Sequence, residues 1–156
     1  MKIFGDPSLG KEIVDLLHEV DRTIAELDVQ HSVKLCGSDV TFFDLNTQVH
    51  GLEAYEQKWN LYKPYMLHGV TIQRRDVNIH VESNLAFIHC YVKLTPANAE
   101  KVKWLSTVKW CRSTICVRKE QGQWKIVHQH VSVPGEFETG AMQVLDLDGE
   151  NREANI

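Results

Sequence analysis

The chain has 156 residues, with 17 Lys plus Arg, 21 Asp plus Glu and a formal net charge of −4. Hydrophobic residues make up 43% and charged residues 24%, which is ordinary for a globular protein and excludes an intrinsically disordered chain. The mild acidity argues against a nucleic-acid binder, and no apolar run reaches the roughly eighteen residues of a membrane span, so we expect a cytoplasmic protein without nucleic-acid or membrane partners.

The first part of the chain predicts helices. A first helix follows Asp6-Pro7-Ser8, which offers a capping residue and a proline suited to a first turn. Asp28 can cap a short second helix that ends at Gly37, and a third helix runs from Gly51 to Tyr62 before Pro64. The apolar face of the first helix is Ile13, Leu16, Leu17, Val20, Ile24 and Leu27, at steps of three and four residues.

The remaining segments predict strands. Residues 38–44 read as a strand and residues 46–51 as a turn, and after Pro64 the pattern alternates over residues 68–82, 85–95, 101–119 and 124–133. A slip in the alternation near Arg74-Arg75 indicates a bulge, and Gln121-Gly122 is typical of a hairpin turn.

Helices followed by strands predict an α+β fold, with helices packed on one face of a curved antiparallel sheet. We expect one domain over residues 1–137, and an acidic tail over residues 138–156 that is mobile or reaches a partner subunit. The last two strands carry apolar residues on both faces, for example Trp110 on one and Ile115 on the other. Helices can cover only one face, so we predict a homodimer through the outer face of the sheet.

The order of these elements and the closing run of residues 122–134 resemble a known superfamily. That run reads Gly-Gln-Trp-Lys-Ile-Val-His-Gln-His-Val-Ser-Val-Pro. It resembles the SnoaL-like proteins of the nuclear transport factor 2-like superfamily and the association domain of calcium/calmodulin-dependent protein kinase, which share a Gly-x-Trp-x-Ile-Val-His-x-His-x-Ser ending. The resemblance spans about Ser8 to Pro134 and implies a cone-shaped sheet wrapped around the N-terminal helices, with a pocket at its wide end. Members include isomerases, cyclases, dehydratases, hydrolases and scaffolds, so the fold alone leaves the function open.

Asp44 is the candidate catalytic residue. In ketosteroid isomerase, a more distant relative, an aspartate at the end of the first strand moves a proton next to a carbonyl, and Asp44 matches its position. In a strand, Val40, Phe42 and Asp44 share one face, so a buried Phe42 would carry Asp44 into the interior. Two alternatives stay open: Asp44 caps the turn at Asn46 or Thr47, or it forms an ion pair with Arg112.

The resemblance also implies that part of the isomerase site is missing. That enzyme holds the enolate oxygen with a tyrosine and a second acid, and Val20 and Thr114 stand at the matching positions. Valine cannot donate a hydrogen bond, and the loss of an oxyanion donor costs on the order of 10²–10³ in rate, so steroid isomerisation by that mechanism is not expected.

Further pocket residues follow from the same matching. It places Val127, Gln129 and Val131 inward, and Trp124, Ile126, His128, His130 and Ser132 outward. We predict a mostly apolar ligand site for an apolar or aromatic small molecule, in which Arg112 would suit a ligand carboxylate. Its predicted lining residues are Trp59, Trp110, Arg112, Thr114, Gln129 and Val131.

No cofactor or metal is expected. The cysteines Cys36, Cys90, Cys111 and Cys116 form no CxxC pair and read as buried, reduced residues. His128 and His130 share a face of the last strand but supply too few ligands for a structural metal site.

Two functions remain at this point. The first is a cofactor-independent isomerase, cyclase or lyase in which Asp44 does acid–base work on a ligand in the pocket. The alternative is a non-catalytic ligand-binding or oligomerisation module that resembles the kinase association domain.

Overall fold

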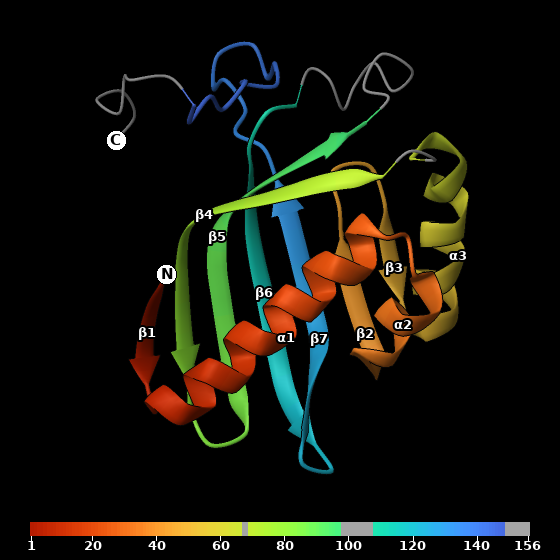
Figure 1. The fold of residues 1–156 in the computed structure, drawn as a ribbon. Helices are drawn as coiled ribbons and strands as arrows, with labels where there is room; N and C mark the ends of the chain where they lie inside the picture. Colours follow the sequence, from red (N-terminus) through yellow and green to blue (C-terminus); the bar gives the residue numbers. More distant parts are fainter. Residues whose placement is uncertain (67–68, 98–107, 149–156) are drawn as a thin grey trace.

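A computed structural model describes residues 1–66, 69–97 and 108–148. Within these residues one sheet of seven strands runs in the order β1-β4-β5-β6-β7-β2-β3. The sheet is curved and open, and α1 lies diagonally across it (Figure 1). The predicted α+β fold, a curved sheet bent around N-terminal helices, is confirmed.

The strands pair mostly antiparallel, as predicted, but β1 pairs with β4 and β2 pairs with β7 in parallel. The short strands β1 and β3 were not anticipated, and β3 lies within the stretch predicted to be a turn. The strand bounds are β1 (Lys2–Gly5), β2 (Cys36–Phe43), β3 (Gln48–His50), β4 (Val70–Val81), β5 (Leu85–Pro96), β6 (Cys111–Glu120) and β7 (Gln123–Ser132).

The helices lie where the sequence predicts them. They are α1 (Pro7–Ala25), α2 (Val29–Lys34) and α3 (Leu52–Tyr62), followed by the 3₁₀ turn η1 (Lys63–Tyr65). The Asp6 carboxylate accepts a hydrogen bond from the Ser8 amide at 2.7 Å and so caps α1. Gly37 was predicted to end α2, but the helix ends at Lys34, and its C-cap residue Leu35 has right-handed helical backbone angles. Gly37 instead lies in β2.

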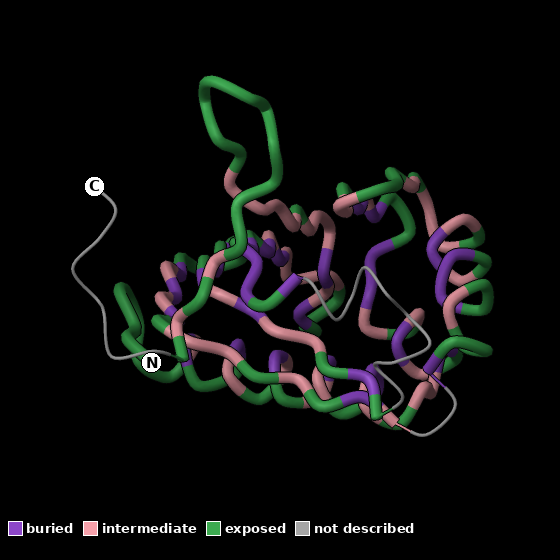
Figure 2. The backbone as a smooth tube through the Cα atoms, turned by 90° about the horizontal axis from the view of Figure 1, so that it is seen from above, coloured by how far each residue is buried: buried purple, intermediate pink, exposed green. Residues whose placement is uncertain are grey.

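The core fills the space between α1 and the concave side of the sheet. Figure 2 shows buried segments where the helices and strands face each other and exposed segments on their outer sides. The buried face of α1 carries Ile13, Leu17, Val20 and Ile24, four of the residues in its predicted apolar stripe. No helix in the described ranges is long and apolar enough to cross a membrane.

Two bulges change which side chains face inward. In β4 the register shifts between Arg75 and Asn78, where Asp76 has φ +50°, which confirms the bulge predicted near Arg74-Arg75. In β7, Ile126 pairs with Val117 and His128 pairs with Cys116, which leaves Val127 as an extra residue.

The β7 bulge reverses the alternation along that strand. Trp124 and Ile126 were predicted to face outward, but both are buried in the core. Val127 does not line the cavity described below, whereas Gln129 and Val131, beyond the bulge, do.

Residues 133–148, named the C-terminal segment here, lie beyond one end of the sheet (Figure 1) and contact residues of β4, β5 and the stretch just before β6. The Trp110 amide donates to the Leu145 carbonyl at 3.1 Å, Lys93 pairs with Asp148 at 2.6 Å, and Lys109 pairs with Asp146. Part of the stretch predicted as a tail thus contacts the body of the protein. Residues 149–156, and residues 101–107 of the predicted long strand, lie outside the described residues, and the mobility of the tail stays a prediction.

Candidate functional site

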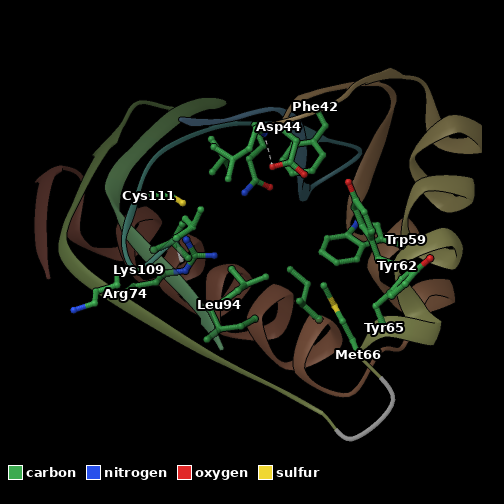
Figure 3. Close-up of a pocket in the computed structure, with 17 residues that line it drawn as sticks. Phe42, Asp44, Trp59, Tyr62, Tyr65, Met66, Arg74, Leu94, Lys109 and Cys111 are labelled. Carbon is green, nitrogen blue, oxygen red and sulfur yellow. Dashed lines mark hydrogen bonds between the residues drawn. The ribbon is translucent and has the colours of Figure 1, made fainter. Parts of the chain in front are cut away.

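A cavity of about 440 Å³ opens between the concave side of the sheet and the helical layer of α3 and η1. In Figure 3, Trp59, Tyr62, Tyr65 and Met66 line one side and face Leu94, Arg74 and Cys111 across the hollow. Most of its wall is apolar or aromatic, with a few polar groups among them, a character typical of small-molecule sites. The lining residues are Ile24, Phe42, Asp44, Leu45, Trp59, Tyr62, Tyr65, Met66, Ile72, Arg74, Val92, Leu94, Val108, Lys109, Cys111, Gln129 and Val131.

Asp44 reaches the cavity from the residue just after β2. Val40 and Phe42 are buried on the inner face of that strand, so the alternation carries Asp44 inward, and its side chain is 17% exposed. The Asp44 amide donates to the Thr47 carbonyl at 2.8 Å, and Oδ1 accepts from the Leu45 amide at 2.8 Å. The residue therefore stabilises the turn and presents a carboxylate to the cavity at the same time, although the predicted cap on Asn46 or Thr47 is replaced by one on Leu45.

The partner of this carboxylate is Lys58, which the sequence analysis did not single out. Lys58 Nζ lies 2.5 Å from Asp44 Oδ2, and the lysine side chain is 4% exposed. Burial lowers the pKa of Lys58, and the neighbouring Asp44 charge opposes that shift.

Arg112 and Thr114 lie outside the cavity, contrary to the prediction. Both are exposed, and Arg112 donates to the Val133 carbonyl at 2.9 Å instead of pairing with Asp44. The inward residues of β6 are the odd-numbered ones, among them Cys111 and Ile115, so the even-numbered ones point to the outer face. The predicted ion pair between Asp44 and Arg112 is therefore wrong.

Trp110 is also misplaced by the prediction. It is only 1% exposed, but the C-terminal segment and two cations cover it on the outer side, and it does not line the cavity. The Arg75 guanidinium lies 5.0 Å and the Lys93 ammonium 5.8 Å from the centre of its ring. Of the predicted pocket residues, Trp59, Gln129 and Val131 line the cavity together with Asp44.

Other polar groups on the wall are already engaged. Arg74 makes a two-nitrogen contact with Asp21 of α1, with Nη2 at 2.6 Å from Oδ1 and Nε at 2.9 Å from Oδ2. Lys109 pairs with Asp146 of the C-terminal segment. Burial, reinforced by the charge of Asp44, raises the pKa of the Cys111 thiol to about 11, so this cysteine stays protonated at neutral pH.

The oxyanion pair of ketosteroid isomerase has no equivalent at the matching positions. Val20 is buried in the core, and Thr114 faces away from the cavity. Gln129 brings a side-chain amide to the same wall as Asp44 and is a hydrogen-bond donor available to a ligand there.

Among the residues that the structure describes, no cluster of three or more His, Cys, Asp and Glu side chains is placed to hold a metal ion. His128 and His130 point to the outer face, where His128 Nδ1 lies 2.6 Å from Thr41 Oγ1. Cys36, Cys90, Cys111 and Cys116 form no disulfide.

Comparison with known proteins agrees with this architecture. The sequence profile of the SnoaL-like domain matches residues 13–136. No curated protein sequence matches the chain.

Several solved structures share the fold. An NTF2-like protein of unknown function from Pseudomonas putida KT2440 superposes with a TM-score of 0.77 at 21% identity, covering 89% of this chain and 96% of that one. A candidate scytalone dehydratase from Novosphingobium aromaticivorans DSM 12444 gives 0.67 at 13% identity, covering 88% and 93%. A candidate ketosteroid isomerase from Shewanella frigidimarina NCIMB 400 gives 0.64 at 16% identity, covering 85% and 100%. At these identities the similarity establishes the fold alone.

Proposed function

The chain belongs to the SnoaL-like family of the nuclear transport factor 2-like superfamily, and we propose that it is a cofactor-independent isomerase, cyclase or lyase acting on an apolar or aromatic small molecule. The observation that carries the proposal is a carboxylate, Asp44, in the wall of a cavity of about 440 Å³ that is otherwise mostly apolar. The names of two structural neighbours, an isomerase and a dehydratase, support the same class of proton-transfer chemistry.

The proposed reaction begins with proton transfer to Asp44. A C–H bond next to a substrate carbonyl breaks, the proton moves to a carboxylate oxygen, and the electron pair stays on the substrate as an enolate. Return of the proton to another carbon completes an isomerisation, whereas loss of a neighbouring hydroxyl with that proton as water completes a dehydration. Gln129 is placed to donate a hydrogen bond to the substrate oxygen, on which negative charge develops.

Deuterium exchange tests the proposal without knowledge of the natural substrate. Wild-type protein in D₂O is incubated with a panel of ring ketones, such as 2-tetralone and a β,γ-unsaturated cyclohexenone, and incorporation next to the carbonyl is followed by NMR. We expect catalysed exchange by the wild type and none by Asp44→Asn. Asp39→Asn is the matched control, because Asp39 lies in β2, the strand that leads to Asp44, but is exposed and pairs with Arg118. Exchange that survives in Asp44→Asn rejects Asp44 as the base.

A non-catalytic ligand-binding protein is the second candidate. The observation that favours it is that both Asp44 oxygens already have protein partners, the Lys58 ammonium and the Leu45 amide. Ring ketones that raise the melting temperature without any exchange would support this reading. An oligomerisation role like that of the kinase association domain stays a prediction from the last strand.

We also propose a homodimer through the outer face of the sheet. Phe43 and Phe87 are exposed there, and each contacts histidines of neighbouring strands, as in the stack of Phe87 on His80 with ring centres 4.5 Å apart. A second copy would remove this aromatic surface from water. Light scattering should give the mass of a dimer, and a monodisperse monomer would contradict the proposal.

A further inference from the structure

Lys58 lies behind Asp44, on the side of α3 that packs against β2. Its ammonium sits 3.4 Å above the centre of the Phe42 ring and 5.6 Å from that of Tyr62. The side chain is 4% exposed and does not line the cavity. A ligand in the cavity would therefore meet Asp44, with the lysine charge behind it.

An ammonium this deeply buried needs compensation. Desolvation of a charged lysine is costly, and the residue is retained in such a place only with an opposite charge and further favourable contacts. Asp44 supplies the charge at 2.5 Å, and the Phe42 ring face supplies a cation–π contact. Lys58, Asp44 and Phe42 thus form one unit that ties α3 to the end of β2.

This unit fixes the carboxylate from two directions. Oδ2 accepts from Lys58 Nζ, and Oδ1 accepts from the Leu45 amide. An ionised carboxylate has about four acceptor sites, so each oxygen keeps a free lone pair for a proton while the group cannot rotate without breaking a hydrogen bond. Fixed orientation of a reacting group is a large part of catalytic efficiency.

We propose that Lys58 is the positioning residue of the site: it holds the Asp44 carboxylate oriented toward the cavity and keeps a positive charge beside it during the reaction. This inference rests on the proposed function.

The charge balance of the proton transfer supports this role. Before transfer the site holds Asp44⁻ and Lys58⁺, and after transfer it holds neutral Asp44, Lys58⁺ and the enolate. The net charge is zero in both states, because the electron pair of the broken C–H bond stays on the substrate oxygen. Lys58 moves no proton and stabilises the enolate electrostatically from behind Asp44, which a low-dielectric cavity favours.

Other ionisable groups near the pair are accounted for. Of the two cations on the cavity wall, Arg74 pairs with Asp21 and Lys109 pairs with Asp146, so Lys58 is the cation in direct contact with Asp44 among the described residues. The remaining ionisable side chains on the wall are Tyr62, Tyr65 and Cys111.

The test is the pH dependence of the exchange rate, measured with the most reactive ketone of the panel. Lys58→Met keeps an unbranched side chain, one atom shorter, and removes its charge. A positive charge next to a carboxylate favours its ionised form, so the loss of the lysine charge should move the acidic limb of the rate profile to higher pH. Loss of orientation should also lower the plateau rate, by up to about 10²-fold.

Two variants control this experiment. Lys63→Met removes an exposed charge just beyond the end of α3 and should leave the profile unchanged. Lys58→Arg keeps the charge but changes its geometry, so the acidic limb should stay in place while the plateau falls. If Lys58→Met does not fold, Lys58→Arg alone tests the inference. An acidic limb of the rate profile that moves although the charge is retained overturns the inference, and so does a plateau rate equal to that of the wild type.

The outcomes separate this inference from the proposed function. Exchange that persists in Asp44→Asn rejects the proposed base, whatever Lys58 does. An inactive Asp44→Asn together with a Lys58→Met profile that coincides with wild type rejects only the role of Lys58. An inactive Asp44→Asn together with a displaced acidic limb in Lys58→Met supports both.

Discussion

Replacement of Trp110 with alanine is expected to destabilise the protein and to leave the cavity intact, because Trp110 is buried under the C-terminal segment and does not line the cavity. The indole is 1% exposed and lies beside Arg75 and Lys93. Replacing a buried tryptophan with alanine costs about 3–5 kcal/mol of unfolding free energy. In a protein of this size each kcal/mol corresponds to about 2–4 °C, so we expect Trp110→Ala to lower the melting temperature by roughly 6–20 °C.

The assay pairs stability with ligand binding. Urea denaturation gives the unfolding free energy, and the fluorescence of N-phenyl-1-naphthylamine reports occupancy of the apolar cavity. Trp59→Ala is the matched control, since Trp59 is also buried but lines the cavity. Both variants should lose stability, whereas only Trp59→Ala should weaken probe binding by changing the cavity wall.

Proteolysis gives a second readout for the same variant. The Trp110 backbone pairs with Leu145 of the C-terminal segment, and loss of the buried indole beside this pairing should loosen it, so Trp110→Ala should speed cleavage between residues 135 and 148. A variant that keeps wild-type stability and loses probe binding as Trp59→Ala does would refute this placement of Trp110.

Three further predictions concern thiol reactivity, acid stability and assembly. Because the pKa of the Cys111 thiol is raised to about 11, this residue in native protein should react with iodoacetamide slowly at pH 8 and faster as the pH rises toward 11. Peptide mass spectrometry measures the extent of labelling. Labelling at pH 7 as fast as in unfolded protein would contradict this prediction. Burial, with a smaller contribution from His130, lowers the pKa of His128 below 6.5, so the folded state loses stability as the pH falls through that lowered value. The melting temperature should therefore drop more between pH 7 and 5 for wild type than for His128→Asn. Equal drops for the two proteins would contradict this prediction. Phe87→Glu on the outer face should convert a dimer into monomers in sedimentation, and an unchanged dimer would place the interface elsewhere.

The elements with strong periodicity could be predicted from the sequence. The first helix has an apolar stripe and a capping aspartate, and both act locally, so neither depends on the rest of the fold. The hairpin at Gln121-Gly122 needs two residues with positive φ, and the structure has φ values of +49° and +82° there.

The faces of the last strands could not be predicted as reliably. The bulge at Val127 inserts one residue, so an alternation counted from either end of β7 gives the wrong face at the other end. Just before β6, Trp110 shares the even-numbered face with Arg112 and Thr114 and makes that face look apolar, and the C-terminal segment that buries Trp110 lies far along the chain. The pattern alone therefore assigned Arg112 and Thr114 to the wrong side.

The burial of Lys58 could not be predicted from the sequence for a different reason. A lysine within an amphipathic helix normally lies on the solvated face, so the residue type alone does not mark Lys58 as buried. Its partner Asp44 lies beyond the turn and strand that precede α3, so the ion pair is a product of tertiary packing. A useful sequence signal is the position of Lys58 one turn beyond Tyr55 and one before Tyr62, on the face that packs on Phe42.

The most direct test of the proposed chemistry is a crystal structure of Asp44→Asn with the most exchange-active ketone bound. We predict that the ligand fills the cavity with its exchanging carbon about 3–3.5 Å from the side chain of residue 44 and its oxygen toward Gln129. A ligand bound on the outer face of the sheet, or one in the cavity with its carbonyl turned away from residue 44, would contradict it.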